Sequence, residues 1–88
     1  MRRFQRRPFI KPIDYSVNIL DFKEIKRVLM DAISTDISEE GMGMRTNYPL
    51  EPGHVLMLNT GVEHKVGIVR WSTLLENKNA YSIGIKFV

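Results

Sequence analysis

The sequence H-K-V-G-I-V-R-W-S-T (residues 64–73) has the alternation of a half-buried β-strand. Val66 and Ile68 fall on one face, and Gly67 and Val69 fall on the other. Two more runs of strand length lie on either side of it, H-V-L-M-L-N-T (54–60) and A-Y-S-I-G-I-K-F-V (80–88). Glycine, glutamate and asparagine residues between these runs mark turns. Short strands at this spacing predict a small β-barrel or sandwich.

The same pattern continues toward the N-terminus. The run I-D-Y-S-V-N-I-L (13–20) alternates apolar with polar residues, which predicts another half-buried strand. The segment G-M-G-M-R-T (41–46) is short, and its glycines disfavour a helix. Tyr48-Pro49 and Pro52-Gly53 mark a loop and a turn before the next strand.

The segment D-F-K-E-I-K-R-V-L-M-D-A-I-S (21–34) permits two interpretations. Its apolar residues have helical spacing, and Asp21 followed by Glu24 resembles a capping box, so the window alone favours an amphipathic helix. The alternative is a polar turn over 21–26 and a strand from about Arg27. That strand would have to bury apolar residues on both faces.

Composition limits the class of protein. The 88 residues make one domain, and 43% hydrophobic and 26% charged residues are typical of a globular chain. Cysteine is absent, so thiolate metal sites and cysteine nucleophiles are excluded. Two histidines are too few for a convincing metal site. No apolar run has the length of a membrane helix or follows the basic N-terminus as in a signal peptide. We therefore expect a cytoplasmic protein without membrane insertion.

Charge is distributed unevenly along the chain. Residues 1–11 contain four arginines and one lysine and no acid, whereas residues 12–88 contain eight basic and ten acidic residues, a sum of −2. We therefore divide the chain into a basic arm, residues 1–12, and a barrel domain, residues 13–88. Such an arm is a solvated tail or binds anions. Arg2 and Arg6 point the same way in an extended chain, and arginine suits phosphates and guanine edges.

A second candidate segment is D-I-S-E-E-G, residues 36–41. Asp36 and Ser38 share a face of an extended chain, and Gly41 permits close approach to the backbone. A carboxylate accepts hydrogen bonds, and guanine offers N1–H and N2–H₂ as adjacent donors. The same residue types also form ordinary turns, because Asp and Ser side chains bond to nearby backbone.

Taken together, these segments resemble the PilZ domain family. The matching residues are Arg2 and Arg6 in an R-x-x-x-R motif, then Asp36, Ser38 and Gly41 in D-x-S-x-x-G. Downstream, G-I-V-R-W (67–71) and Y-S-I-G-I-K-F (81–87) are similar to the family's last two barrel strands. The resemblance covers nearly the whole chain, in the family's order.

The resemblance implies an all-β fold, a six-stranded antiparallel barrel with a Greek-key-like layout and little or no helix. It places a strand at about Arg27–Asp36. It also implies binding of cyclic di-GMP, a bacterial second messenger. The sequence shows no nucleophile–base pair and no cluster of metal ligands, so we expect no catalysis, metal or other cofactor. The arginines would reach phosphate and the Hoogsteen edge of guanine. The aspartate–serine–glycine segment would hold a guanine from the other side.

Four further residues are candidates for ligand contact. Arg3 and Arg7 form a second R-x-x-x-R in a shifted register. Trp71 either stacks on a purine or is a structural residue on the sheet, and Arg70 either supports phosphates or is a surface charge.

We expect the arm to become ordered on binding and a protein partner to read the change. The alternatives are a PilZ-like interaction module that does not bind nucleotide and a barrel that binds RNA or single-stranded DNA. The acidic balance of residues 12–88 disfavours nucleic acid.

Overall fold

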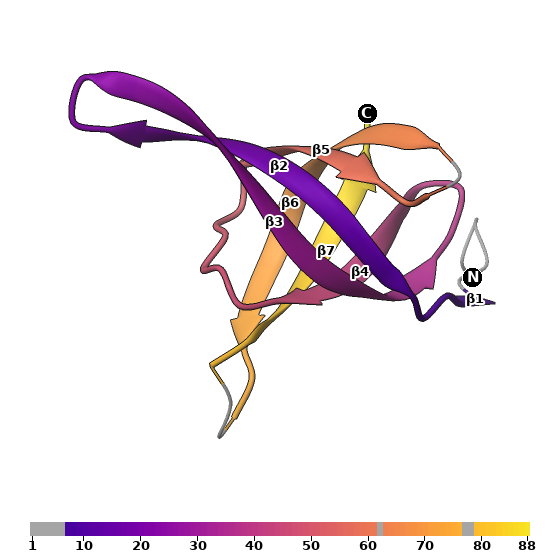
Figure 1. Cartoon of the computed structure of the whole chain (residues 1–88). Helices are drawn as coiled ribbons and strands as arrows, with labels where there is room; N and C mark the ends of the chain where they lie inside the picture. Colours follow the sequence, from indigo (N-terminus) through magenta and orange to yellow (C-terminus); the bar gives the residue numbers. More distant parts are fainter. Residues whose placement is uncertain (1–6, 62, 77–78) are drawn as a thin grey trace.

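The structure is a computed structural model that describes residues 7–61, 63–76 and 79–88 (Figure 1). All regular elements in this part of the chain are strands, seven in number. They are β1 (Arg7–Pro8), β2 (Pro12–Asp21), β3 (Glu24–Ile37), β4 (Gly41–Thr46), β5 (Val55–Asn59), β6 (His64–Leu74) and β7 (Tyr81–Phe87). The described residues include no helix long and apolar enough to cross a membrane.

Six of the strands form a closed antiparallel barrel. The neighbours run β3-β2-β5-β6-β7-β4, and β4 pairs with β3 to close the ring. The short strand β1 adds to the end of β3, on the side where β2 also pairs. The predicted six-stranded antiparallel barrel is confirmed. Closure leaves no free edge within the ring itself.

The barrel interior is filled by alternate residues of each strand. In β2 the predicted inner face is confirmed, since Ile13, Tyr15 and Val17 are buried while Asp14 and Asn18 are exposed. Ser16 departs from the predicted alternation because it is also buried, and its hydroxyl accepts a hydrogen bond from Arg27 Nε at 3.2 Å. The remaining buried apolar residues come from every other barrel strand and one loop, and they are Ala32, Met42, Met44, Leu50, Leu56, Leu58, Val69, Ile83 and Ile85. Burial of these side chains is the main favourable contribution to folding.

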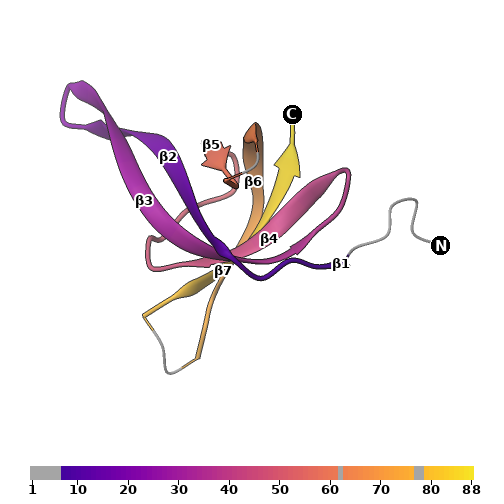
Figure 2. The same cartoon turned by 45° about the vertical axis from the view of Figure 1, so that its right-hand side comes forward.

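Residues 21–34 form a turn and a strand, not a helix. Phe22 and Lys23 make the turn, and β3 then runs over 14 residues, so it starts earlier than the predicted Arg27. The expected burial on both faces is wrong, because Ile25 is 74% and Leu29 79% exposed. The reason is geometric: the β2–β3 hairpin extends beyond the rest of the barrel (Figures 1 and 2), and no other strand of the described residues covers its outer face.

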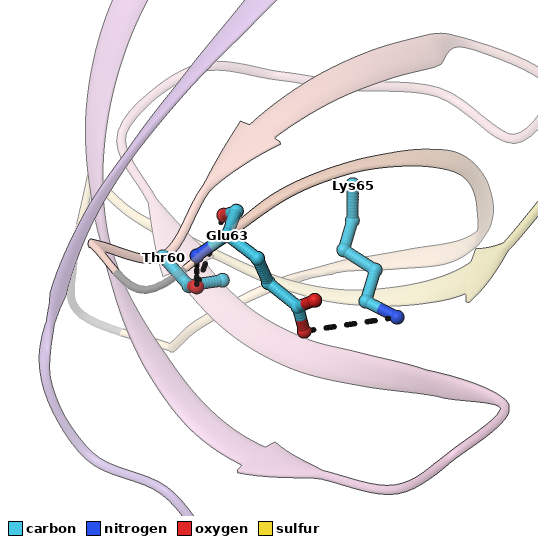
Figure 3. Close-up of polar contacts among 3 residues, drawn as sticks. All are labelled: Thr60, Glu63 and Lys65. Carbon is cyan, nitrogen blue, oxygen red and sulfur yellow. Dashed lines mark hydrogen bonds and ion pairs between the residues drawn. The ribbon is translucent and has the colours of Figure 1, made fainter.

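The turn between β5 and β6 is held by a short polar network (Figure 3). The hydroxyl of Thr60 donates to the carbonyl of Glu63 at 3.2 Å and accepts from its N–H at 3.3 Å. Glu63 also forms an ion pair with Lys65, 3.7 Å between Oε1 and Nζ. Both side chains of this ion pair are partly exposed, so the pair contributes little to stability. The turn is held mainly by the two hydrogen bonds between the Thr60 hydroxyl and the backbone of Glu63.

Candidate ligand-binding surface

Four residues on adjacent strands form a row across the outside of the barrel. Asp36 of β3 pairs with Gly43 of β4, Gly43 with Gly84 of β7, and Gly84 with Trp71 of β6. The neighbours of the two glycines along their strands point into the core, so the glycines face outward. We call these four residues the glycine row. At about 4.8 Å between strands, the row extends roughly 14 Å from the strand of Asp36 to the strand of Trp71.

Asp36 closes one end of the row. A bulge at Thr35 interrupts the pairing of β3 with β4, so Thr35 and Asp36 both lie beside Gly43. The Thr35 hydroxyl donates to Asp36 Oδ1 at 3.3 Å. A Cβ on Gly43 would lie 2.5 Å from Asp36 Oδ1 and 2.7 Å from Thr35 Oγ1. The carboxylate is therefore placed over the backbone of β4, where only glycine leaves room for it.

Trp71 closes the other end. A second bulge, at Arg70, interrupts the pairing of β6 with β7 and lies immediately before Trp71. A Cβ on Gly84 would overlap three atoms of the indole, Nε1, Cε2 and Cδ1, so the indole covers this glycine. Trp71 is nevertheless 48% exposed, which leaves a large part of the ring accessible. An aromatic ring over a strand glycine compensates for the missing side chain and presents a stacking surface to solvent.

Ser38 and Gly41 shape the turn that follows Asp36. The N–H of Ser38 donates to the carbonyl of Gly41 at 2.9 Å, and the Ser38 hydroxyl accepts from the N–H of Glu40 at 3.2 Å. Gly41 is the first residue of β4, and its Cβ would overlap the carbonyl oxygen of Ile85 in β7. Gly41 is thus needed for close packing of two backbones, not for a left-handed turn.

The end of the basic arm is attached beside Asp36. In β1, Arg7 pairs with Ile37 and Pro8 pairs with Asp36. Phe9 continues this attachment, since its N–H donates to the carbonyl of Thr35 at 3.1 Å. The buried Ser34 hydroxyl donates to the carbonyl of Phe9 and accepts from the N–H of Lys11 at 3.1 Å. The predicted arm therefore joins the barrel at the candidate site.

The structure brings together part of the predicted site. Asp36, Ser38, Gly41 and Trp71 lie on or next to the glycine row, and Arg7 and Arg70 are exposed at its two ends. Arg2, Arg3 and Arg6 lie outside the described residues. Sequence reasoning did not assign Gly43 or Gly84 to the site. Glycine inside a strand marks a close approach of another group, and this pattern was present in G-M-G-M and in Y-S-I-G-I.

The glycine row combines an acidic side chain with an aromatic one. Two buried glycine backbones lie beneath the two larger groups, Gly43 beneath a carboxylate that accepts hydrogen bonds and Gly84 beneath a partly exposed aromatic ring. Two hollows lined by described residues lie away from the row, one beside Arg45 and one beside Met57. Within residues 7–61, 63–76 and 79–88, no three His, Asp or Glu side chains are grouped as metal ligands.

Neither a protein-family model nor a curated protein matches the chain.

Proposed function

We propose that this chain is a PilZ-type receptor module for cyclic di-GMP, with the ligand bound along the glycine row. The observation that carries the proposal is the pairing of Pro8 with Asp36, because Pro8 follows R-x-x-x-R by two residues and Asp36 begins D-x-S-x-x-G. Arg7 and Pro8, the two residues that follow R-x-x-x-R in the sequence, pair with the strand that carries D-x-S-x-x-G. Arg6 precedes Pro8 by two residues, and two residues span at most about 7 Å.

The exposed chemistry of the row fits a guanine dinucleotide. The Asp36 carboxylate offers two acceptor oxygens, which match the adjacent N1–H and N2–H₂ donors of guanine. The indole of Trp71 offers a stacking surface for a purine, and such stacking contributes about 1–3 kcal/mol per base. The Ser38 hydroxyl keeps acceptor capacity beyond its bond from Glu40. Arginines at the end of the arm would pair with the two phosphates.

In this proposal the module is not an enzyme. It acts in the bacterial cytoplasm, and a protein partner reads its bound state. The arginine arm closes over the ligand. This closure brings the basic segment, residues 1–12, against the remainder of the chain, which has a net negative charge. The body of the barrel stays unchanged, because its core does not take part in the site.

Calorimetric titration with cyclic di-GMP tests the proposal, with GTP, cyclic GMP and cyclic di-AMP as controls. We expect binding of cyclic di-GMP and far weaker binding of cyclic di-AMP, which lacks the donors that Asp36 would recognise. Arg2→Ala and Arg6→Ala should each abolish most binding without lowering the melting temperature. If none of the nucleotides binds, the interaction-module alternative replaces the proposal.

The role of Asp36 has a matched control, Asp14, on the neighbouring strand β2. Asp36→Asn should weaken binding of cyclic di-GMP by about 1–3 kcal/mol, the value of a bidentate base contact. Asp14→Asn changes an exposed carboxylate on β2 that pairs with Asp31, five residues before Asp36 along β3, and should leave affinity unchanged. Equal losses in the two variants would mean that the carboxylate acts only through net charge.

A further inference from the structure

The β2–β3 hairpin exposes a strand edge that the barrel does not close. β3 pairs with β2 along its first ten residues, Glu24–Ile33, but it pairs with β4 only from Ile33 onward. Among the described strands, residues 24–32 therefore have a neighbour on one side only. Figures 1 and 2 show this hairpin extending away from the barrel, at the opposite end of β3 from β1. Such an edge is a template for another strand.

The backbone direction identifies which groups of the edge are available. The N–H of Ser34 donates to the carbonyl of Lys11, next to β2, so Ser34 faces the β2 side. Peptide groups alternate along a strand, and the N–H and C=O of Arg27, Leu29 and Asp31 therefore face the unpaired side. Three consecutive odd-numbered residues thus present six backbone groups to a partner strand.

We infer that this edge pairs antiparallel with the same edge of a second copy of the chain, about a two-fold axis at Leu29. In this register Leu29 lies opposite Leu29 of the other copy, and Arg27 lies opposite Asp31 in both halves. Each copy donates three backbone hydrogen bonds and accepts three. The pairing ends where β4 begins to occupy the edge, at Ile33. An isologous contact of this kind closes as a dimer.

Side-chain matching selects this register over its neighbours. With the axis at Val28, Arg27 would face Leu29 and Ile25 would face Asp31. With the axis at Arg27, two guanidinium groups would lie opposite each other, which is destabilising. Charged residues on an edge normally oppose pairing with another chain. Here a cation and an anion lie symmetrically about Leu29, so self-pairing brings opposite charges together.

Two features of the single chain favour a second copy of the chain as the partner at this edge. Leu29 is 79% exposed at the centre of the edge, and pairing would cover it. Asp14 and Asp31 are direct cross-strand partners and both are exposed, and like charges in that position repel. Arg45 lines the hollow beside them but forms no ion pair with either among the described residues. Within its own chain Arg27 Nε donates to the Ser16 hydroxyl at 3.2 Å, and the remaining guanidinium N–H groups of Arg27 in the second copy would supply a cation at this pair.

Sedimentation of the full chain over a range of concentrations tests the inference. We expect reversible doubling of the mass. Leu29→Pro removes the backbone N–H at the centre of the edge in each copy, and we expect this loss to abolish doubling of the mass. The variant should still fold, because proline is tolerated on an edge strand. Ile25→Pro is the matched control, because its N–H faces the same side but lies outside the paired register. It should still dimerise.

Charge variants test the register and do not depend on proline. Arg27→Asp alone and Asp31→Arg alone should each be monomeric, whereas their equimolar mixture should form a heterodimer with opposite charges in both halves. The double variant should dimerise with itself. The inference would be overturned if the wild-type chain stays monomeric at every concentration. The same holds if the chain pairs only with a different protein. Doubling that survives in Leu29→Pro or in both single charge variants would also overturn it.

Discussion

Gly43 lies directly opposite Gly84 on the outside of the barrel, and the absent side chains of this pair leave room for two larger ones. Asp36 extends over Gly43 from one side, and Trp71 covers Gly84 from the other. Both flanking strands carry a bulge next to the row, at Thr35 and at Arg70. Bulges change the direction of side chains, so the row depends on four strands together.

Gly43→Ala tests whether the position of the Asp36 carboxylate matters for the ligand. The new methyl group would meet only side-chain oxygens, Asp36 Oδ1 and Thr35 Oγ1, which can rotate away. We expect weaker binding of cyclic di-GMP in calorimetry and a small change in melting temperature. Unchanged affinity would show that the ligand does not use the carboxylate where the structure places it.

Gly41→Ala should have the opposite profile, although it lies two residues away on the same strand. Its methyl group would overlap the backbone carbonyl of Ile85, which cannot move without opening the β4–β7 pairing. Overpacking of this kind costs about 1–3 kcal/mol. We expect a lower melting temperature in thermal unfolding. A normal melting temperature with lost binding would instead make Gly41 a ligand contact.

Trp71 is the only tryptophan of the chain, so its fluorescence reports on one position. If a guanine stacks on the exposed part of the indole, cyclic di-GMP should change the emission in a saturable manner. Trp71→Leu should weaken binding by about 1–3 kcal/mol, the value of one stacked base. Emission that stays constant while calorimetry records binding would remove Trp71 from the site.

The buried phenol of Tyr15 should make the free energy of unfolding depend on pH in the alkaline range. Burial raises the pKa of its phenol above the ordinary value of 10.0, while the hydrogen bond with Thr46, 2.7 Å between the two oxygens, partly offsets this. Because the pKa of Tyr15 is higher in the folded than in the unfolded state, the protonated phenol contributes to the stability of the fold. This contribution is complete below about pH 10, and it is lost as the pH rises through the pKa of the folded state.

The variant Tyr15→Phe cannot ionise and should lose this part of the alkaline dependence. It should also lose about 0.5–1.5 kcal/mol at neutral pH with the hydrogen bond to Thr46. Chemical unfolding of both proteins at pH 7 and at pH 11 measures the two effects. Parallel losses of stability between the two pH values would exclude Tyr15 as the source.

Local patterns were sufficient where a strand has one buried face. The alternation in β2 and that of Ile83 and Ile85 in β7 predicted the strands and their inner sides. β3 was ambiguous because Ile25 and Leu29 have helical spacing, whereas in the structure both are exposed on a hairpin that leaves the barrel. Periodicity assumes that apolar residues are buried, and here that assumption fails.

The candidate site was predictable only in part, for a related reason. Asp36 and Trp71 were recognised within their own segments, but their common row depends on pairings between β3, β4, β7 and β6. Two one-residue bulges set that register, and neither has a distinctive sequence. Ser38 illustrates the reverse case, since its hydroxyl was assigned to ligand and already has a bond within the turn.

Backbone amide chemical-shift mapping with cyclic di-GMP tests the central claim most directly. If the ligand lies along the glycine row, the largest changes should fall on Asp36, Gly43, Gly84 and Trp71 and on the arginines of the arm. Residues of β5 on the far side of the barrel should change little. Changes centred on β2 and β5, or no changes at saturating ligand, would contradict the account.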